Sequence, residues 1–346
     1  MIELTRGDLL TADVEAVVNT VNCVGYMGKG IALQFKQAFP ENFAAYQQAC
    51  ARGEVRPGRM FVFETRLLHG PKYVINFPTK RHWRGRSRLE DIGDGLVALV
   101  EEVRTRNIRS IAVPPLGCGN GGLDWRIVRP LIEEALRPLE SVRVVLYEPA
   151  GTPEARSMPV RTAPPGMTVA RALFVQVMNQ YLTLSYRLTL LEIQKLAYFL
   201  QEAGEPLRLR YEAGLYGPFA ANLNKVLERI EGHFIRGYGD SQKPDAEIEL
   251  MGDVVGKAGD FLADHPQSRS RLEEVARLIE GFETPYGMEL LSSVHWVATH
   301  ESPKATTAGE ALRAVHRWNE RKRRMFSPDR IKFAWDRLGE AGWLSR

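Results

Sequence analysis

The densest group of chemically useful side chains lies in one short stretch, KRHWRGRSR, which begins at Lys80 and ends at Arg88. It holds five cations, one indole ring and no acidic side chain. A lysine amine that is neutral for part of the time can attack an electrophilic carbon or transfer a proton. Neighbouring cations disfavour another positive charge and so lower the pKa of a lysine. Taken alone, the stretch is typical of a solvated basic loop, in which the neighbouring arginines would also make the amine of Lys80 easier to deprotonate.

The same stretch has the composition of a surface for single-stranded nucleic acid. Guanidinium groups bind phosphates, and an unstacked base packs against an aromatic face. The candidate contacts are Arg81, Trp83, Arg84 and Arg86. Because they follow Lys80 directly, they indicate a nucleic-acid substrate rather than a protein side chain. A charged loop without any partner has the same composition.

Three other segments place glycine and small polar residues where strands are expected to end. The first joins residues 7–10, GDLL, with residues 17–22, VVNTVN, and the second is residues 25–32, GYMGKGIA, which runs into a helix. The third, residues 117–122, has four glycines in six positions, so backbone amides can surround an oxyanion such as a diphosphate. Its spacing matches neither a Walker A loop nor the dinucleotide fingerprint, which disfavours nucleoside triphosphate hydrolysis and hydride transfer. Each segment alone is also explained by an ordinary turn or helix cap.

The elements that must position these residues change character near the middle of the chain. β-Branched runs at 16–18, 61–63, 73–77, 110–113 and 142–147 alternate with helical patterns at 30–38, 90–106 and 125–136. This alternation predicts an α/β sandwich with a largely parallel sheet. Five prolines then interrupt residues 149–167. Beyond them, apolar spacing predicts helices at 169–184, 190–202, 219–230, 270–282 and 292–299, so the second half is expected to be mainly helical.

Length and composition agree with two ordinary domains. The 346 residues exceed the size at which one core is the safe assumption, and the proline-rich segment divides them into 1–150, a linker at 151–167, and 168–346. The net charge of +4 is too small to establish a polyanionic partner. Three widely spaced cysteines without a CxxC pair argue against a disulfide framework and a zinc site. With no export signal and no membrane-spanning run, we expect a cytoplasmic protein that needs neither a metal nor a cofactor.

Taken in order, the three glycine-containing segments resemble the macrodomain family, the α/β modules that bind ADP-ribose. The resemblance covers about the first 150 residues. The segment INFPTK, residues 75–80, is similar to a branch of ADP-ribosyl hydrolases in which a lysine after this strand is catalytic. Some relatives in that branch carry an aspartate in the glycine loop, whereas this chain has Gly121 at the matching position, with Asp124 as a candidate substitute.

The resemblance implies a role for each matching position. Lys80 is implied as the catalytic residue and Thr79 as a neighbour of the ligand. The adenine is implied to contact Asp8 and Leu9. The distal ribose and the following loop and helix are implied to involve Thr20, Val21, Asn22, Ile31, Ala32, Leu33 and Gln34. The diphosphate is implied to lie against Gly117, Cys118, Gly119, Asn120 and Gly121.

The second half resembles a helical domain that occurs beside bacterial toxin genes. The matching features are a lysine on an apolar helix at 191–200, LEIQKLAYFL, and a Tyr-Gly-Pro turn at 216–218. A macrodomain joined to such a domain implies an antitoxin that removes ADP-ribose from single-stranded DNA. It also implies a cognate DNA ADP-ribosyltransferase toxin as the partner. A toxin that modifies DNA exposes a groove for a polyanion, so an acidic face would fit it. The candidate contacts, which a solvated helix face also explains, are Asp245, Glu247, Glu249, Glu273 and Glu274. A non-catalytic ADP-ribose reader and a hydrolase of ADP-ribosylated protein are the alternative functions.

Overall fold

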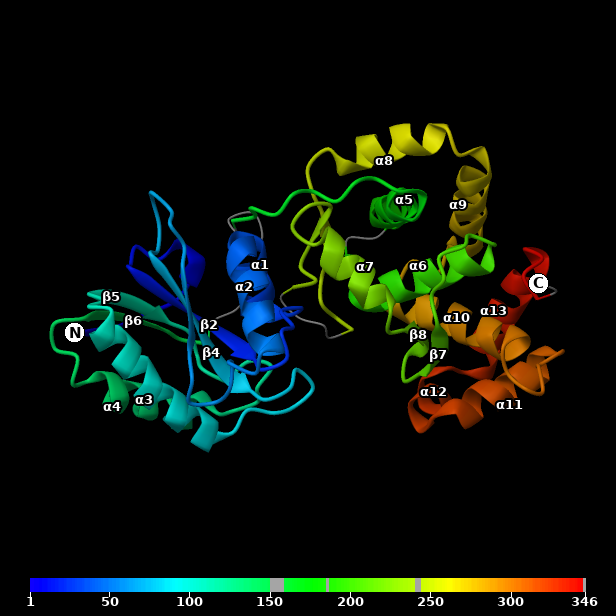
Figure 1. Ribbon diagram of the computed structural model, residues 1–346. Coiled ribbons are helices and arrows are strands. Elements are labelled where there is room, and N and C mark those ends of the chain that lie inside the picture. Colours follow the sequence, from blue (N-terminus) through cyan, green and yellow to red (C-terminus); the bar gives the residue numbers. More distant parts are fainter. Residues whose placement is uncertain (150–158, 185–186, 240–243, 345–346) are drawn as a thin grey trace. The chain divides into compact units, whose positions relative to one another are not determined.

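The computed structural model describes residues 1–149, 159–184, 187–239 and 244–344 (Figure 1). The chain forms two compact units, one mainly of residues 1–163 and the other mainly of residues 164–346. Residues 150–158, which include the first part of the expected linker at 151–167, lie outside the described residues.

The first unit is built on a six-stranded sheet with the strand order β1-β6-β5-β2-β4-β3. The strands are β1 (Ile2–Thr5), β2 (Ala16–Asn22), β3 (Phe61–Glu64), β4 (Tyr73–Lys80), β5 (Ser110–Val113) and β6 (Arg143–Tyr147). Every neighbouring pair is parallel except β3 and β4, which are antiparallel. The predicted mixed, largely parallel sheet is therefore confirmed.

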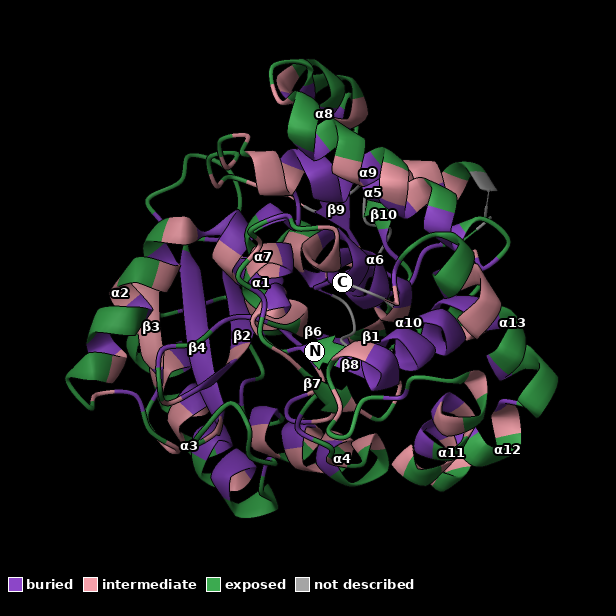
Figure 2. Cartoon of the chain, turned by 90° about the vertical axis from the view of Figure 1, so that its right-hand side faces the viewer, coloured by how far each residue is buried: buried purple, intermediate pink, exposed green. Residues whose placement is uncertain are grey.

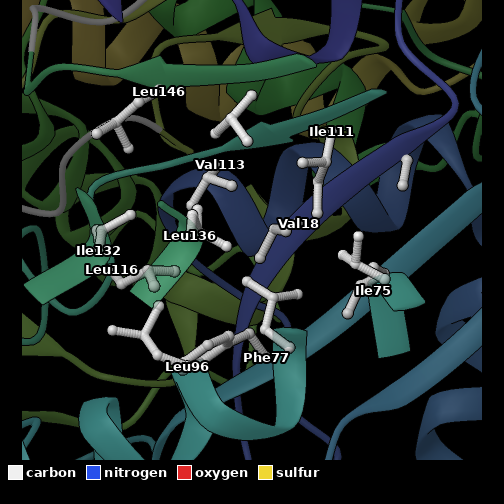
Figure 3. Packing of buried hydrophobic residues seen from close by; sticks show 14 of the residues in the cluster. Val18, Ile75, Phe77, Leu96, Ile111, Val113, Leu116, Ile132, Leu136 and Leu146 are labelled. Carbon is white, nitrogen blue, oxygen red and sulfur yellow. The ribbon is translucent and has the colours of Figure 1, made fainter. Parts of the chain in front are cut away.

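Helices cover both faces of this sheet because successive strand residues point to opposite sides. Val18 faces α3 (Leu89–Thr105) and α4 (Trp125–Leu136), in the cluster drawn in Figure 3. Val17 instead packs with Phe35 of α1 (Gly30–Ala38). The helix α2 (Pro40–Ala51) buries Tyr46 beside Val21, at the end of β2. This α/β/α sandwich holds the carboxyl ends of β2, β4 and β5 along one edge.

The second unit is mainly helical, as predicted. Its helices are α5 (Val169–Leu184), α6 (Leu190–Glu202), α7 (Leu223–Ile230), α8 (Val254–Ala263), α9 (Pro266–Ile279), α10 (Pro285–Thr299), α11 (Ala308–Trp318), α12 (Glu320–Met325) and α13 (Pro328–Glu340). Its short strands are β7 (Tyr211–Gly214), β8 (Gly217–Ala220), β9 (Ile235–Arg236) and β10 (Glu249–Leu250). α10 is buried from Gly287 to Ala298, which Figure 2 shows as an almost continuously buried helix.

Three helix boundaries in this unit differ from the sequence prediction. The helix expected at 219–230 begins at Leu223, because residues 217–220 pair with β7 as the strand β8. The helices expected at 270–282 and 292–299 begin earlier, at Pro266 and Pro285. Proline at the first position of a helix lacks only an amide that has no partner there, so it starts a helix readily.

Buried polar groups at the centre of this unit join the lysine of the apolar helix to the Tyr-Gly-Pro turn. Lys195, on α6, is buried and donates a hydrogen bond to the Pro218 carbonyl, 2.6 Å away. Burial lowers the pKa of Lys195 to about 7. The buried carboxylate of Glu289 accepts from Lys322, at 2.7 Å, and from Arg321, at 2.5 Å. The hydrogen bond from Lys195 to Pro218 thus places the lysine of the apolar helix in direct contact with the Tyr-Gly-Pro turn.

Candidate functional site

Three loops leave the sheet at the carboxyl ends of β2, β4 and β5, where open α/β sheets bind ligands. Asn22, the last residue of β2, is the register partner of Lys80, the last residue of β4. The glycine segment 117–122 follows β5. The sheet thus places residues 25–32, the basic stretch that begins at Lys80 and the glycine segment at the same edge, while residues 7–10 follow the parallel edge strand β1.

Lys80 is half-buried, and its amine donates a hydrogen bond to the carbonyl of Asn120 in the glycine segment. Burial lowers the pKa of Lys80, and the nearby cation of Lys29 lowers it further. The following arginines were expected to lower this pKa, but its causes are burial and Lys29. Both effects make the amine easier to deprotonate at the position expected to be catalytic.

The glycine segment is folded back on itself by its own backbone. Gly117 adopts a left-handed conformation with φ of +72°, and its carbonyl accepts from the Leu123 amide at 3.1 Å. The Ser87 amide donates to the Gly121 carbonyl, also at 3.1 Å. A Cβ atom at Gly121 would lie 2.1 Å from the Gly117 carbonyl oxygen, whereas a Cβ at Gly119 would meet no atom within 4 Å. Position 121 therefore accommodates only glycine in this conformation, which leaves no room there for a carboxylate beside Lys80.

Asp124 does not replace that carboxylate. It caps α4, where its side chain accepts from the Arg126 amide at 2.9 Å and pairs with the Arg126 guanidinium at 2.7 Å. The hydrogen bonds from Arg126 hold the pKa of Asp124 below its usual value. In the part of the chain that the structure describes, no acidic side chain bonds to the Lys80 amine.

Asp8 stands at the start of a short 3-10 helix, Leu9–Thr11, with one oxygen used locally and one unused. Its Oδ1 accepts from the Leu10 amide at 2.9 Å, while Oδ2 is buried with no hydrogen-bond partner. Burial raises the pKa of this carboxyl. A buried acceptor that lacks a donor is suited to an amine on a ligand. The Leu9 side chain packs in the core, so only its backbone is available to a ligand.

The residues expected near the distal ribose differ in how far they are exposed. Val21 and Leu33 are core residues, and Asn22, Gln34 and Thr79 are buried. Half-buried positions are Thr20, Ile31 and Ala32. Asn22 organises the loop after β2, because its side chain accepts from the Val24 amide and donates to the Tyr26 carbonyl, at 3.0 and 2.5 Å.

The basic segment after β4 is exposed apart from Ser87. The Arg81 guanidinium pairs with the buried carboxylate of Asp91 on α3, at 3.0 Å, so one of the four expected nucleic-acid contacts is already engaged. Arg84 lies over the Trp83 ring, 4.6 Å from its centroid. The Asp91 pairing joins residues from two different elements, and spacing along the chain gave no indication of it.

The chain is similar to known proteins over its first unit and over its full length. Residues 18–132 match the Macro domain family model. The DNA ADP-ribosyl glycohydrolase of Thermus aquaticus is 46% identical over 344 residues, spanning 99% of this chain and 94% of that protein. The chain belongs to the DNA ADP-ribosyl glycohydrolase family. The glycohydrolase of Mycobacterium tuberculosis is also 46% identical, over 98% of this chain and 99% of its own length.

Partial matches to this glycohydrolase involve the macrodomain or a fusion protein. A DNA ADP-ribosyl transferase-DNA ADP-ribosyl glycohydrolase fusion protein of Thermosipho africanus is 36% identical, over 43% of this chain and 42% of the fusion. The solved macrodomain of Mycobacterium tuberculosis DarG is 58% identical and covers 43% of this chain and 99% of its own, with a TM-score of 0.43. The macrodomain resemblance found in the sequence is confirmed by the family match.

The described residues lack the features of a metal centre and of a membrane span. They contain no group of three or more His, Cys, Asp or Glu side chains placed to hold a metal ion. No helix among them has the length and apolar character needed to cross a bilayer.

Lys29 gives the site a testable pH dependence. If the Lys80 amine must be neutral to act, the rate rises as the pH passes upward through the pKa of Lys80. Removing the Lys29 cation raises that pKa, so Lys29→Met should move the rising limb of the kcat–pH profile to higher pH. Lys29→Arg keeps the cation and should leave the limb in place. Profiles that coincide for Lys29→Met and the unaltered protein would contradict this coupling.

Proposed function

We propose that this protein hydrolyses the bond between ADP-ribose and a base of ADP-ribosylated single-stranded DNA. The observation that carries the proposal is full-length identity of 46% to a protein named DNA ADP-ribosyl glycohydrolase. Lys80 supports it, because its half-buried amine lies at the end of β4 with a lowered pKa. Exposed cations and an indole ring follow immediately, which favours DNA over a protein side chain as the substrate.

In this proposal each loop has a separate task. Asp8 accepts from the adenine amine through its unused oxygen, and the amides of residues 117–121 surround the diphosphate. These contacts place the distal ribose, with its glycosidic bond, at Lys80. There the neutral amine either attacks the anomeric carbon of the opened ribose, which expels the base and forms an imine that water then hydrolyses, or acts as an acid–base group. In the second case the ammonium form donates a proton to the departing base while water attacks the anomeric carbon, and the neutral form takes up a proton from that water.

Substrate comparison tests the activity. Purified protein is incubated with an ADP-ribosylated single-stranded oligonucleotide and, in parallel, with ADP-ribosylated protein, and released ADP-ribose is measured. We expect release from the oligonucleotide at a much higher rate. Binding of ADP-ribose without release from either substrate would indicate a reader, and preferential release from protein would indicate a protein-directed hydrolase.

We also propose that the second unit binds and inhibits a cognate DNA ADP-ribosyltransferase toxin in the cytoplasm. The fusion protein of Thermosipho africanus supports this association, since it joins the two activities in one chain. A transferase that acts on DNA must offer a groove for a polyanion, which favours an acidic partner surface. Asp245, Glu249 and Glu273 are exposed, whereas Glu247 pairs with Arg187 at 3.0 Å.

Inhibition can be separated from hydrolysis in the intact chain. The Lys80→Ala protein, which we expect to lack hydrolase activity, is mixed with the transferase and a DNA substrate. We expect the initial rate of DNA modification to fall as this variant is added and the two proteins to co-elute on size exclusion. An unchanged rate together with separate elution would remove this role from the second unit.

A further inference from the structure

The loop after β2 presents one aromatic ring, that of Tyr26, on a rigid support. Its backbone is held by Asn22, as described above, and by Gln47, whose side chain donates to the Gly25 carbonyl at 3.2 Å. The Tyr26 ring lies directly against Gly28, where a Cβ atom would come within 2.4 Å of it. Glycine at position 28 therefore lets the ring lie close to the loop backbone, and 37% of Tyr26 remains exposed.

The loop after β4 presents a second ring beside the first. Trp83 is 39% exposed, and its ring centroid lies 5.6 Å from that of Tyr26. His82 stacks on Trp83 with a centroid distance of 5.4 Å and an interplanar angle of 29°. A hydrogen bond from the Gly85 amide to the His82 carbonyl, 3.0 Å long, closes the turn that carries these rings.

This aromatic group lies on the same edge of the sheet as the amine proposed to be catalytic. The two loops leave adjacent parallel strands from paired residues, Asn22 and Lys80. The Cys23 thiol donates to the Lys80 carbonyl at 3.3 Å, which holds the start of one loop against the start of the other. The rings are therefore fixed just beyond the reactive lysine.

The group has the features of a stacking surface for a polyanion. The Arg84 guanidinium lies 4.6 Å from the Trp83 centroid, and Arg86 is exposed two residues further on. The segment from Lys80 to Arg88 contains no acid that would repel a phosphate. Exposed aromatic side chains beside guanidinium groups bind unpaired bases and the phosphates that join them.

We propose that Tyr26, Trp83 and Arg84 form a stacking subsite for an unpaired base next to the nucleotide that carries ADP-ribose. This inference rests on the proposed function and specifies how its substrate is held. Because every base has an aromatic face, the subsite favours unpaired neighbours without selecting their sequence. Bases in a duplex are stacked on each other and cannot occupy it.

A comparison of a long and a short substrate distinguishes binding at this subsite from the chemistry at Lys80. The ratio of kcat/KM for an ADP-ribosylated single-stranded oligonucleotide to that for an ADP-ribosylated mononucleoside is measured, because only the oligonucleotide supplies a neighbouring base. Stacking of one base contributes about 1–3 kcal/mol, so Trp83→Ala should lower this ratio about tenfold. Tyr26→Ala should lower it in the same direction, and Trp83→Tyr, which keeps a ring, should restore most of it.

Two controls keep the result interpretable. Leu68→Ala alters a 96% exposed apolar side chain elsewhere and should leave the ratio unchanged. If Trp83→Ala slows both substrates equally, or neither, the subsite proposal is overturned while the hydrolase proposal stands. If the unaltered protein releases ADP-ribose from neither substrate, the hydrolase proposal itself fails.

Discussion

Replacing Lys80 with alanine is expected to abolish release of ADP-ribose from modified single-stranded DNA while leaving ADP-ribose binding intact. The contacts assigned to the ligand are made by backbone amides of the glycine segment and by the Asp8 carboxylate, so the substitution removes none of them and loses only the hydrogen bond from the amine to the Asn120 carbonyl. General acid–base groups contribute roughly 100- to 10,000-fold to a rate, so we expect a loss of about 100-fold or more. Release is followed by chromatography of the oligonucleotide, and binding of free ADP-ribose by calorimetry.

Two further variants sharpen this result. Lys80→Arg keeps a cation and similar reach, but a guanidinium is never neutral at ordinary pH, so it should be as inactive as Lys80→Ala. Lys72→Ala removes an exposed lysine just before the same strand and should keep full activity. Normal turnover by Lys80→Ala would show that the amine has no part in the chemistry.

The position of Lys80 illustrates how far the sequence could predict the first unit. The β-branched run identified the strand only as far as Phe77, and the next residue, Pro78, lacks an amide donor for a sheet. In the structure β4 continues to Lys80, and the register with β2 shifts between Val21 and Asn22, next to the proline. The irregular pairing accommodates Pro78 and carries the lysine to the end of the strand.

Features that depend on contacts between distant segments could not be predicted in this way. Lys29 and Lys80 are far apart in sequence, and their coupling exists only because the sheet brings their loops together. The same is true of Arg81 and Asp91, whose ion pair joins a loop to α3. Glycine spacing, by contrast, is local, because the conformation of a tight loop depends mainly on its own residues.

Two positions of the glycine segment, 121 and 119, are expected to differ in how far substitution lowers the affinity for ADP-ribose. Gly121→Ala should reduce ADP-ribose affinity about 100-fold, because its Cβ would lie 2.1 Å from a backbone oxygen, and relieving such overpacking forces the backbone to move. Movement of this loop displaces the amides proposed to surround the diphosphate. Calorimetry with ADP-ribose measures the loss, and a thermal melt shows whether the first unit remains folded.

Gly119 supplies the matched control within the same segment. A Cβ there would meet no atom within 4 Å, so Gly119→Ala should bind ADP-ribose within about twofold of the unaltered protein. Gly119→Glu also finds open space, yet it places a carboxylate against the proposed diphosphate position and should lose binding through repulsion between like charges. The three variants separate the effect of loop shape from that of charge. If Gly121→Ala loses ADP-ribose affinity and Gly119→Ala keeps it, binding depends on the conformation of the glycine segment. If Gly119→Glu loses affinity, an anionic group of the ligand lies within that segment. Equal affinities for all three would mean that the diphosphate lies elsewhere.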